Sequence, residues 1–175
     1  RTGKLFAYEH YDVEADIICC GKGISSGLPL SAVLGRKELI DADPSLNSTH
    51  GGNPVCSAAT LASLEILESE NLIEESARKG KIIEKELQKI LTKFPNRIQF
   101  SGKGMVYAIH VKNTSNSGLD VEIVDRIIEK SMQKGVLLIR TGTGTIKIGP
   151  PLTIPDDALI EGLSVIEESI IELFQ

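Results

Sequence analysis

The sequence predicts an α/β chain in two parts, and three observations support this. Short apolar runs at 16–20 and 30–34 have the length of strands and stand on either side of a glycine-rich turn. Two long segments before Pro95 carry apolar residues at the three- and four-residue spacing of amphipathic helices. After Pro95 the pattern changes to short strands that alternate with helices. We therefore expect a first domain at 1–95 and a smaller α+β domain at 96–175.

The elements of the first domain follow in chain order. The runs at 16–20 and 30–34 are expected to be neighbouring strands of a sheet. A polar loop at 47–53 then ends in Asn53, an N-cap residue, with Pro54 at the first helical position. Such a helix N-terminus suits an anion such as phosphate, although an ordinary capped helix start explains the same residues. Two helices are expected to follow, at 55–70 and 71–94.

The second domain begins with a change of period. Residues of alternating polarity around glycine-rich turns predict hairpin strands, and apolar stripes at helical spacing predict two helices between and after them. The expected elements are strands at 97–100 and 105–112, a helix at 121–132 closed by Gly135, strands at 136–140 and 145–148, and a terminal helix from Asp156.

The composition limits the class of protein. Of the 175 residues, 41% are apolar, which is enough for a packed core. The net charge of −5 argues against a nucleic-acid-binding surface. No apolar run approaches the roughly 20 residues that span a bilayer. With no signal peptide in view, we expect a cytoplasmic protein without membrane contact. The chain begins at Arg1 and looks cut from a longer protein.

Neither a metal site nor a disulfide framework is expected. The odd number of cysteines and the lack of C-x-x-C spacing favour small core residues, and the histidines lack a spacing such as H-E-x-x-H. The residues concerned are Cys19, Cys20, Cys56, His10, His50 and His110.

Lys22 is the residue with the clearest chemical potential. Gly21 and Gly23 flank it, so no neighbouring Cβ crowds the ammonium and the backbone can adopt a positive φ. At the end of a buried strand the ammonium would lose hydration, which lowers the pKa of a lysine toward the state that a Schiff-base lysine needs. The alternative is a solvated lysine in an ordinary turn, and the local pattern leaves both open.

Two other motifs compete for the same turn. The dinucleotide fingerprint G-x-G-x-x-G would need a third glycine where Ser26 stands, and Pro29 disfavours the helix that must follow. Residues 23–27 do match G-x-S-x-G, the nucleophile elbow of the α/β-hydrolases, with Ser25 as the nucleophile. That elbow must also lead into a helix, whereas 28–35 is extended in pattern. A serine hydrolase that uses Ser25 therefore remains as a distant alternative.

The ordered motifs resemble the carboxyl-terminal part of class-III pyridoxal-phosphate aminotransferases, the group with 4-aminobutyrate, ornithine and acetylornithine aminotransferases. The resemblance covers essentially the whole chain and implies fold type I, with the end of the large cofactor domain followed by the small C-terminal domain. The motifs lie at 1–3, 6–10, 16–18, 21–23, 27–33, 49–54, 135–138 and 150–154.

The resemblance assigns roles to individual residues. It implies that Lys22 forms the Schiff base with pyridoxal 5'-phosphate, and that Thr49, with Ser48 alongside, binds the cofactor phosphate of a neighbouring subunit in a homodimer or larger assembly. The reaction implied is transfer of an amino group from an amino acid or ω-amine, of the 4-aminobutyrate or ornithine type, to a 2-oxo acid. Racemases and phospholyases share the fold and stay as an alternative.

The substrate carboxylate has two candidate ligands. Most relatives carry an arginine in the strand before the Pro-Pro-Leu motif, and here the matching residue is Lys147. If Lys147 faces the site, its ammonium holds a carboxylate less rigidly than a guanidinium. The alternative is that Arg140, on the preceding strand, or a residue elsewhere binds the carboxylate. In the family, the pyridine-binding aspartate, the ring-covering aromatic and a phosphate loop precede the R-T-G motif. We therefore expect these 175 residues alone to be inactive and to expose apolar surface around 1–50.

Overall fold

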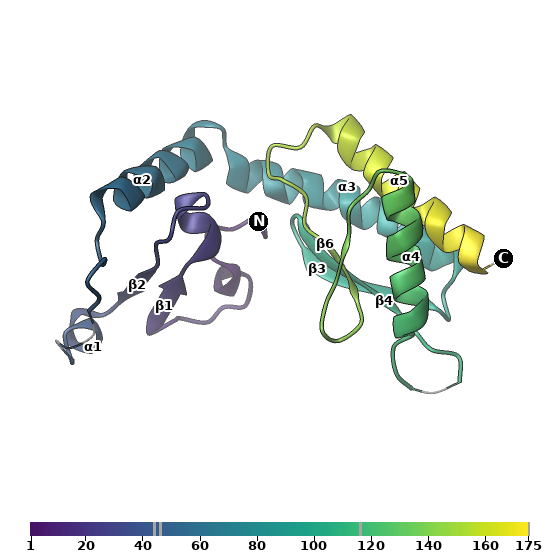
Figure 1. The fold of residues 1–175 in the computed structure, drawn as a ribbon, viewed down its shortest axis with the longest axis horizontal. Coiled ribbons are helices and arrows are strands. Elements are labelled where there is room, and N and C mark those ends of the chain that lie inside the picture. The colour runs from purple at the N-terminus through teal and green to yellow at the C-terminus, as the bar shows by residue number, and fades with distance from the viewer. Residues whose placement is uncertain (44, 46, 116, 175) are drawn as a thin grey trace. The chain divides into compact units, whose positions relative to one another are not determined.

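The computed structural model describes residues 1–43, 45, 47–115 and 117–174, and its contacts separate two compact units (Figure 1). We call Phe6–Leu72 the turn unit, and Arg1–Leu5 together with Ile73–Gln175 the sheet unit. The predicted domain boundary at 95/96 stays a prediction.

The turn unit contains the predicted pair of strands. Strand β1 (Ile17–Cys20) pairs antiparallel with β2 (Ala32–Gly35), with Ile17 opposite Gly35 and Cys20 opposite Ala32. The prediction that these runs are neighbours is therefore confirmed. The other elements of this unit are the 3-10 helices η1 (Ala7–His10) and η2 (Lys22–Ser25), and the α-helices α1 (Lys37–Ile40) and α2 (Pro54–Ser69).

The prediction that the first strand is buried is wrong for the described chain. Ile17 is 48% exposed and Cys19 is also exposed, because two strands cannot cover their own faces. The expectation of exposed apolar surface in this region agrees with the structure. The exposed large apolar side chains of the turn unit are Tyr11, Val13, Ile17, Leu28, Val33, Leu34, Ile40, Val55, Leu61, Leu64 and Ile66.

The sheet unit contains a four-stranded antiparallel sheet in the order β3-β4-β6-β5. Every predicted strand and helix of this unit is present, although β3 runs further than expected and β5 and β6 are shorter. The elements are α3 (Leu72–Lys93), β3 (Ile98–Lys103), β4 (Val106–Val111), α4 (Val121–Gln133), β5 (Ile139–Arg140), β6 (Ile146–Ile148) and α5 (Asp156–Phe174).

One face of this sheet forms the core with the helices α3, α4 and α5, which Figure 1 shows beside it. Alternation decides which side chains are inside: Ile109 of β4 and Ile146 of β6 face each other in the core, whereas Lys147 between two buried isoleucines is exposed. The apolar stripe predicted for α3 is confirmed, because Ile83, Leu87 and Ile90 of this helix are buried against the sheet.

Ion pairs join the exposed edges of α4 and α5. Lys130 and Lys134 donate to Glu172 at 2.8 and 2.7 Å, and Lys134 also reaches Glu168 at 3.1 Å. The hydrogen bonds from Lys130 and Lys134 lower the pKa of Glu172 to about 2. The bonds to Glu172 and Glu168 raise the pKa of Lys134.

These pairs predict how stability depends on pH. Because the folded state lowers the pKa of Glu172 from 4.5 to about 2, its contribution to the free energy of unfolding is complete above pH 4.5 and disappears as the pH falls toward 2. Glu172→Gln should therefore reduce the loss of unfolding free energy between pH 4.5 and 2, which we call the acid limb. The reduction should be small because the pair is exposed. Urea unfolding at several pH values between 2 and 6 measures the effect.

Glu161→Gln is the control, because Glu161 is exposed on the same helix and makes no ion pair within the described residues. An acid limb as steep in Glu172→Gln as in Glu161→Gln would contradict the assignment.

Candidate active site

Lys22 opens η2 directly after β1, in a conformation that the flanking glycines permit. Its φ is 53°, in the left-handed region that few side-chain-bearing residues adopt. A Cβ placed on Gly21 or Gly23 would meet no described atom within 4 Å. The backbone on both sides of Lys22 is therefore open to close approach by a ligand.

Hydrogen bonds fix the turn that carries Lys22. Ile24 N–H donates to Gly21 O and Ser26 N–H donates to Gly23 O, both at 3.3 Å, so the turn is closed on itself. The Ser26 hydroxyl also lies 2.8 Å from the Ser63 hydroxyl of α2. The lysine thus stands on a turn that is attached to a helix, and its position does not depend on its own side-chain contacts.

The structure leaves the Lys22 side chain exposed, so the predicted burial of this residue is wrong for the described chain. The exposure follows from that of β1, since the strand before Lys22 has no covering layer. An open hollow of about 500 Å³ adjoins the lysine. Its lining residues are Lys22, Gly23, Ser26, Gly27, Leu28, Pro29 and Leu30.

Ser25 does not occupy the position of a hydrolase nucleophile. Its side chain is 1% exposed, and its hydroxyl donates to Leu28 O. A nucleophile elbow needs an exposed Oγ and a helix directly after the serine. In the described chain, η2 ends at Ser25 and a bend leads on to β2. The geometry therefore removes the support for the hydrolase alternative.

Ser48 and Thr49 lie in the loop before α2, and both are exposed. A turn in which Gly51 N–H donates to Ser48 O at 2.9 Å shapes this loop. Neither hydroxyl residue lines the hollow at Lys22, so the structure does not bring them together with Lys22 in one pocket.

The start of α2 is an ordinary capped helix end. As predicted, Asn53 is the N-cap, and its Oδ1 accepts from the N–H groups of Val55 at 3.0 Å and Cys56 at 3.3 Å. Because the cap takes these two donors, a phosphate bound nearby would depend on the hydroxyls of Ser48 and Thr49 more than on the helix end.

Lys147 and Arg140 point to opposite faces of the sheet. Lys147 lies on the exposed face, opposite Ala108 of β4 and Ile139 of β5, and makes no ion pair with the described residues. Arg140 lies opposite the buried Ile146, and its Nε forms an ion pair with Asp125 Oδ1 of α4 at 2.7 Å. Of the two predicted carboxylate ligands, Lys147 is therefore the one without an ion pair among the described residues.

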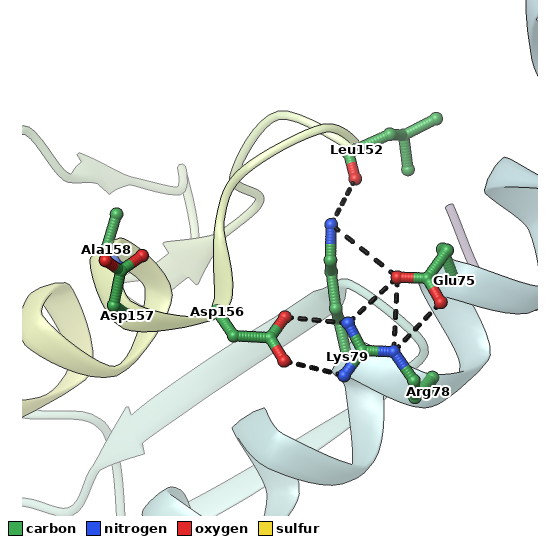
Figure 2. Close-up of polar contacts among 7 residues, drawn as sticks. All are labelled: Glu75, Arg78, Lys79, Leu152, Asp156, Asp157 and Ala158. Atoms are coloured by element: carbon green, nitrogen blue, oxygen red, sulfur yellow. Dashed lines mark hydrogen bonds and ion pairs between the residues drawn. The ribbon is translucent and has the colours of Figure 1, made fainter. Parts of the chain in front are cut away.

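A group of charged residues that the sequence analysis missed joins the first turns of α3 to the start of α5 (Figure 2). Arg78 forms ion pairs with Glu75 at 2.8 Å and with Asp156 at 2.7 Å, and the Lys79 ammonium donates to Leu152 O at 3.0 Å. These pairs raise the pKa of Arg78 and lower those of Asp156 and Glu75.

One sequence signal could have indicated Lys79. It lies four residues before Ile83, and so belongs to the apolar stripe of α3 rather than to the charged face. A lysine on the buried stripe of a helix needs a polar partner inside the protein. The partner, Leu152 O, is far along the chain and could not be read from the local pattern.

The described part of the chain contains neither a metal site nor a membrane span. Among the described residues, no group of three or more His, Cys, Asp or Glu side chains could hold a metal ion. Within the same residues, no helix has the length and apolar character needed to cross a bilayer.

Comparisons with known proteins bear on the whole chain. A family model described as "Aminotransferase class-III" matches residues 1–170. A probable 4-aminobutyrate aminotransferase of Bacillus subtilis is 39% identical across 97% of this chain, and an alanine/serine racemase of Pyrococcus horikoshii is 36% identical across 97%. The crystal structure of an acetylornithine aminotransferase from Elizabethkingia anophelis superposes with a TM-score of 0.86 at 33% identity over 98% of this chain.

The chain corresponds to only part of each of these proteins. It spans 40% of the Bacillus protein, 36% of the Pyrococcus protein and 43% of the solved Elizabethkingia chain.

Proposed function

Because this chain belongs to the class-III aminotransferases, whose fold type I it shares, we propose that the complete protein is an aminotransferase in which Lys22 carries the cofactor. The family depends on pyridoxal 5'-phosphate. The observation that carries the proposal is the Lys22 amine, exposed beside an open hollow on a turn closed by its own hydrogen bonds.

The residues around Lys22 fit such a cofactor. An aldehyde must reach the amine, and the flanking glycines leave open space on both sides of it. Pyridoxal phosphate, when bound, supplies the electron sink that stabilises negative charge at the substrate carbon. Lys22 Nζ would hold the cofactor, and its amine would move the proton at the substrate Cα.

The cofactor phosphate is assigned to exposed hydroxyls. We propose that Thr49, with Ser48 beside it, binds this phosphate on a neighbouring subunit, so that a homodimer or larger assembly completes the site. Support comes from their position in a loop that leaves both residues exposed. The cytoplasmic location expected from the sequence also stays a prediction.

The substrates proposed are an amino acid or ω-amine as donor and a 2-oxo acid as acceptor. Two relatives are named for 4-aminobutyrate and acetylornithine, and Lys147 offers an exposed ammonium for a carboxylate. Racemisation of an amino acid is the second candidate, because a relative 36% identical to this chain is named alanine/serine racemase. Both reactions need a base at the substrate Cα, so they share the role of Lys22.

Borohydride reduction tests the proposal. In the complete protein supplied with pyridoxal phosphate, reduction should fix the cofactor on Lys22, and peptide mapping should find the label on the peptide that contains it. Lys37, the other lysine of the turn unit, is the internal control, since it is exposed and paired with Asp41. Label on Lys37, on another lysine or on none would overturn the assignment of Lys22.

The two candidate reactions are separated by their products. A single L-amino acid incubated with the complete enzyme and a 2-oxo acid gives a new amino acid if the enzyme transfers amino groups. Without an acceptor, a racemase instead produces the D-enantiomer of the same amino acid, which chiral chromatography detects.

A further inference from the structure

Two sequence motifs whose roles remained open meet in the sheet unit. The Arg1 guanidinium, in the R-T-G motif, donates to Pro150 O at 2.7 Å. Lys79 donates to Leu152 O at 3.0 Å, two residues further along the Pro-Pro-Leu motif (Figure 2). Two cations therefore bind neighbouring carbonyl groups of the same segment, 149–152, which follows strand β6.

The Arg1 end of this arrangement is fixed by close packing. Arg1 O accepts from Met105 N–H at 2.7 Å and from the Ser76 hydroxyl, a fully buried side chain of α3. A Cβ on Gly104 would stand 2.4 Å from Arg1 O, and one on Gly80 would stand 2.5 Å from Gly104 O. Only glycines allow these backbones to approach so closely. Arg1 thus presents its guanidinium from a rigid base.

Lys79 is a buried cation with a specific partner. Its residue is 6% exposed, and besides Leu152 O it has Glu75 Oε2 at 4.0 Å. Figure 2 shows its amine between the carboxylate of Glu75 and the carbonyl of Leu152. Burying an ammonium group costs on the order of several kcal/mol of folding free energy. An apolar side chain of similar length would fill the same space without that cost. Packing alone therefore does not account for a lysine here, whereas a bond to the segment does.

The bound segment lies beside Lys147. Gly149 follows Lys147 by two residues, and the position of a Cβ on Gly149 is 3.7 Å from Lys147 Cε. The Lys147 side chain therefore lies along the first residue of the segment. Residues 149–155 contain no helix or strand, and the one backbone bond found within them joins Ile154 N–H to Pro151 O. Leu152 and Ile154 pack against the core, and the two cations bind the carbonyl groups of Pro150 and Leu152, so both kinds of contact hold the segment.

We propose that Arg1 and Lys79 are positioning residues that hold 149–152 and thereby set the reach of Lys147 toward the carboxylate of the substrate. The proposal rests on the proposed function for the meaning of Lys147. The hydrogen bonds, the burial of Lys79 and the position of Lys147 beside Gly149 do not depend on it.

The test uses Lys79→Met in the complete enzyme. Methionine keeps the length and apolar stem of the side chain but cannot donate to Leu152 O. We expect faster amide hydrogen exchange at Gly149, Leu152, Thr153 and Ile154, and a KM for a carboxylated amine raised about tenfold or more with a smaller change in kcat. The KM for the matching decarboxylated amine should stay near that of the parent.

Matched variants complete the experiment. Lys81→Met removes an exposed lysine from the same helix and should change neither exchange nor KM. Lys79→Arg restores a hydrogen-bond donor. It should bring the exchange rates and the KM part of the way back to those of the parent. Exchange rates and KM values in Lys79→Met equal to those in Lys81→Met would overturn the proposal. So would a KM raised equally for both amines, because that result means general damage.

Failure of the proposed function is recognised separately. Borohydride labelling reports on Lys22, which belongs to the turn unit, and hydrogen exchange of 149–155 reports on the segment without a measurement of activity. A protein without label at Lys22 but with faster exchange in Lys79→Met would refute the aminotransferase assignment and leave the anchoring of the segment standing.

Discussion

Replacing Lys22 with alanine in the complete enzyme is expected to lower kcat about a thousandfold and to abolish borohydride labelling of the turn unit. The loss is large because one amine both holds the cofactor and moves the proton at the substrate Cα, and positioned acid–base groups alone contribute about 10²–10⁴-fold. Stability should hardly change, since Lys22 is exposed. Steady-state kinetics with thermal unfolding as a folding check measures both.

Lys37→Ala is the control, since this lysine lies in the same unit and its side chain is 88% exposed. It should keep the activity of the parent. Added methylamine should restore part of the activity of Lys22→Ala, because a small free amine can replace the missing base. Activity of Lys22→Ala within a few-fold of Lys37→Ala would refute the role of Lys22.

The second large effect is expected for Lys147→Met, and it should be selective. A hydrogen bond to a charged group contributes about 1.5–3 kcal/mol, which corresponds to a loss of about 10- to 150-fold in kcat/KM. We expect that loss for a carboxylated amine and none for its decarboxylated analogue. The comparison of the two substrates removes any general effect of the substitution on the fold.

Arg140→Met distinguishes the two candidate ligands. Its guanidinium is bound to Asp125 on the helix side of the sheet, so its loss should affect both substrates equally. A selective loss in Arg140→Met, together with unchanged kinetics in Lys147→Met, would transfer the carboxylate-binding role to Arg140.

The sequence predicts those elements whose signals are local. The stripe that contains Ile83, Leu87 and Ile90 defines the buried face of α3, and Asn53 with Pro54 marks the start of α2 to the residue. The helix start depends on contacts within a few residues. The apolar stripe identifies the buried face whichever part of the protein covers it. The same holds for the β1–β2 pair, where a short apolar run suffices to indicate a strand.

Burial and long-range partners could not be predicted in this way. The apolar run before Lys22 indicates that a covering layer is needed, but no pattern in the run says which residues provide it, and the described chain leaves Ile17 half exposed. Lys79 shows the same limit for a polar group, because its partner Leu152 lies 73 residues away. The face of Lys147 also became clear only when the register placed Ile146 and Ile148 in the core.

The sheet unit consists of two separate pieces of chain, and the turn unit is the stretch that connects them. The chain leaves the sheet unit after Leu5 and returns at Ile73, and Gly3 packs against Ala77 so closely that an added Cβ would stand 2.8 Å from it. In polymer terms, the turn unit is a loop whose two ends are joined. The entropy of closing a flexible loop grows only with the logarithm of its length, by about 0.6 kcal/mol for each doubling. Insertions in the exposed connections of the turn unit should therefore leave the sheet unit nearly as stable as before. Added residues there would lower its free energy of unfolding only slightly.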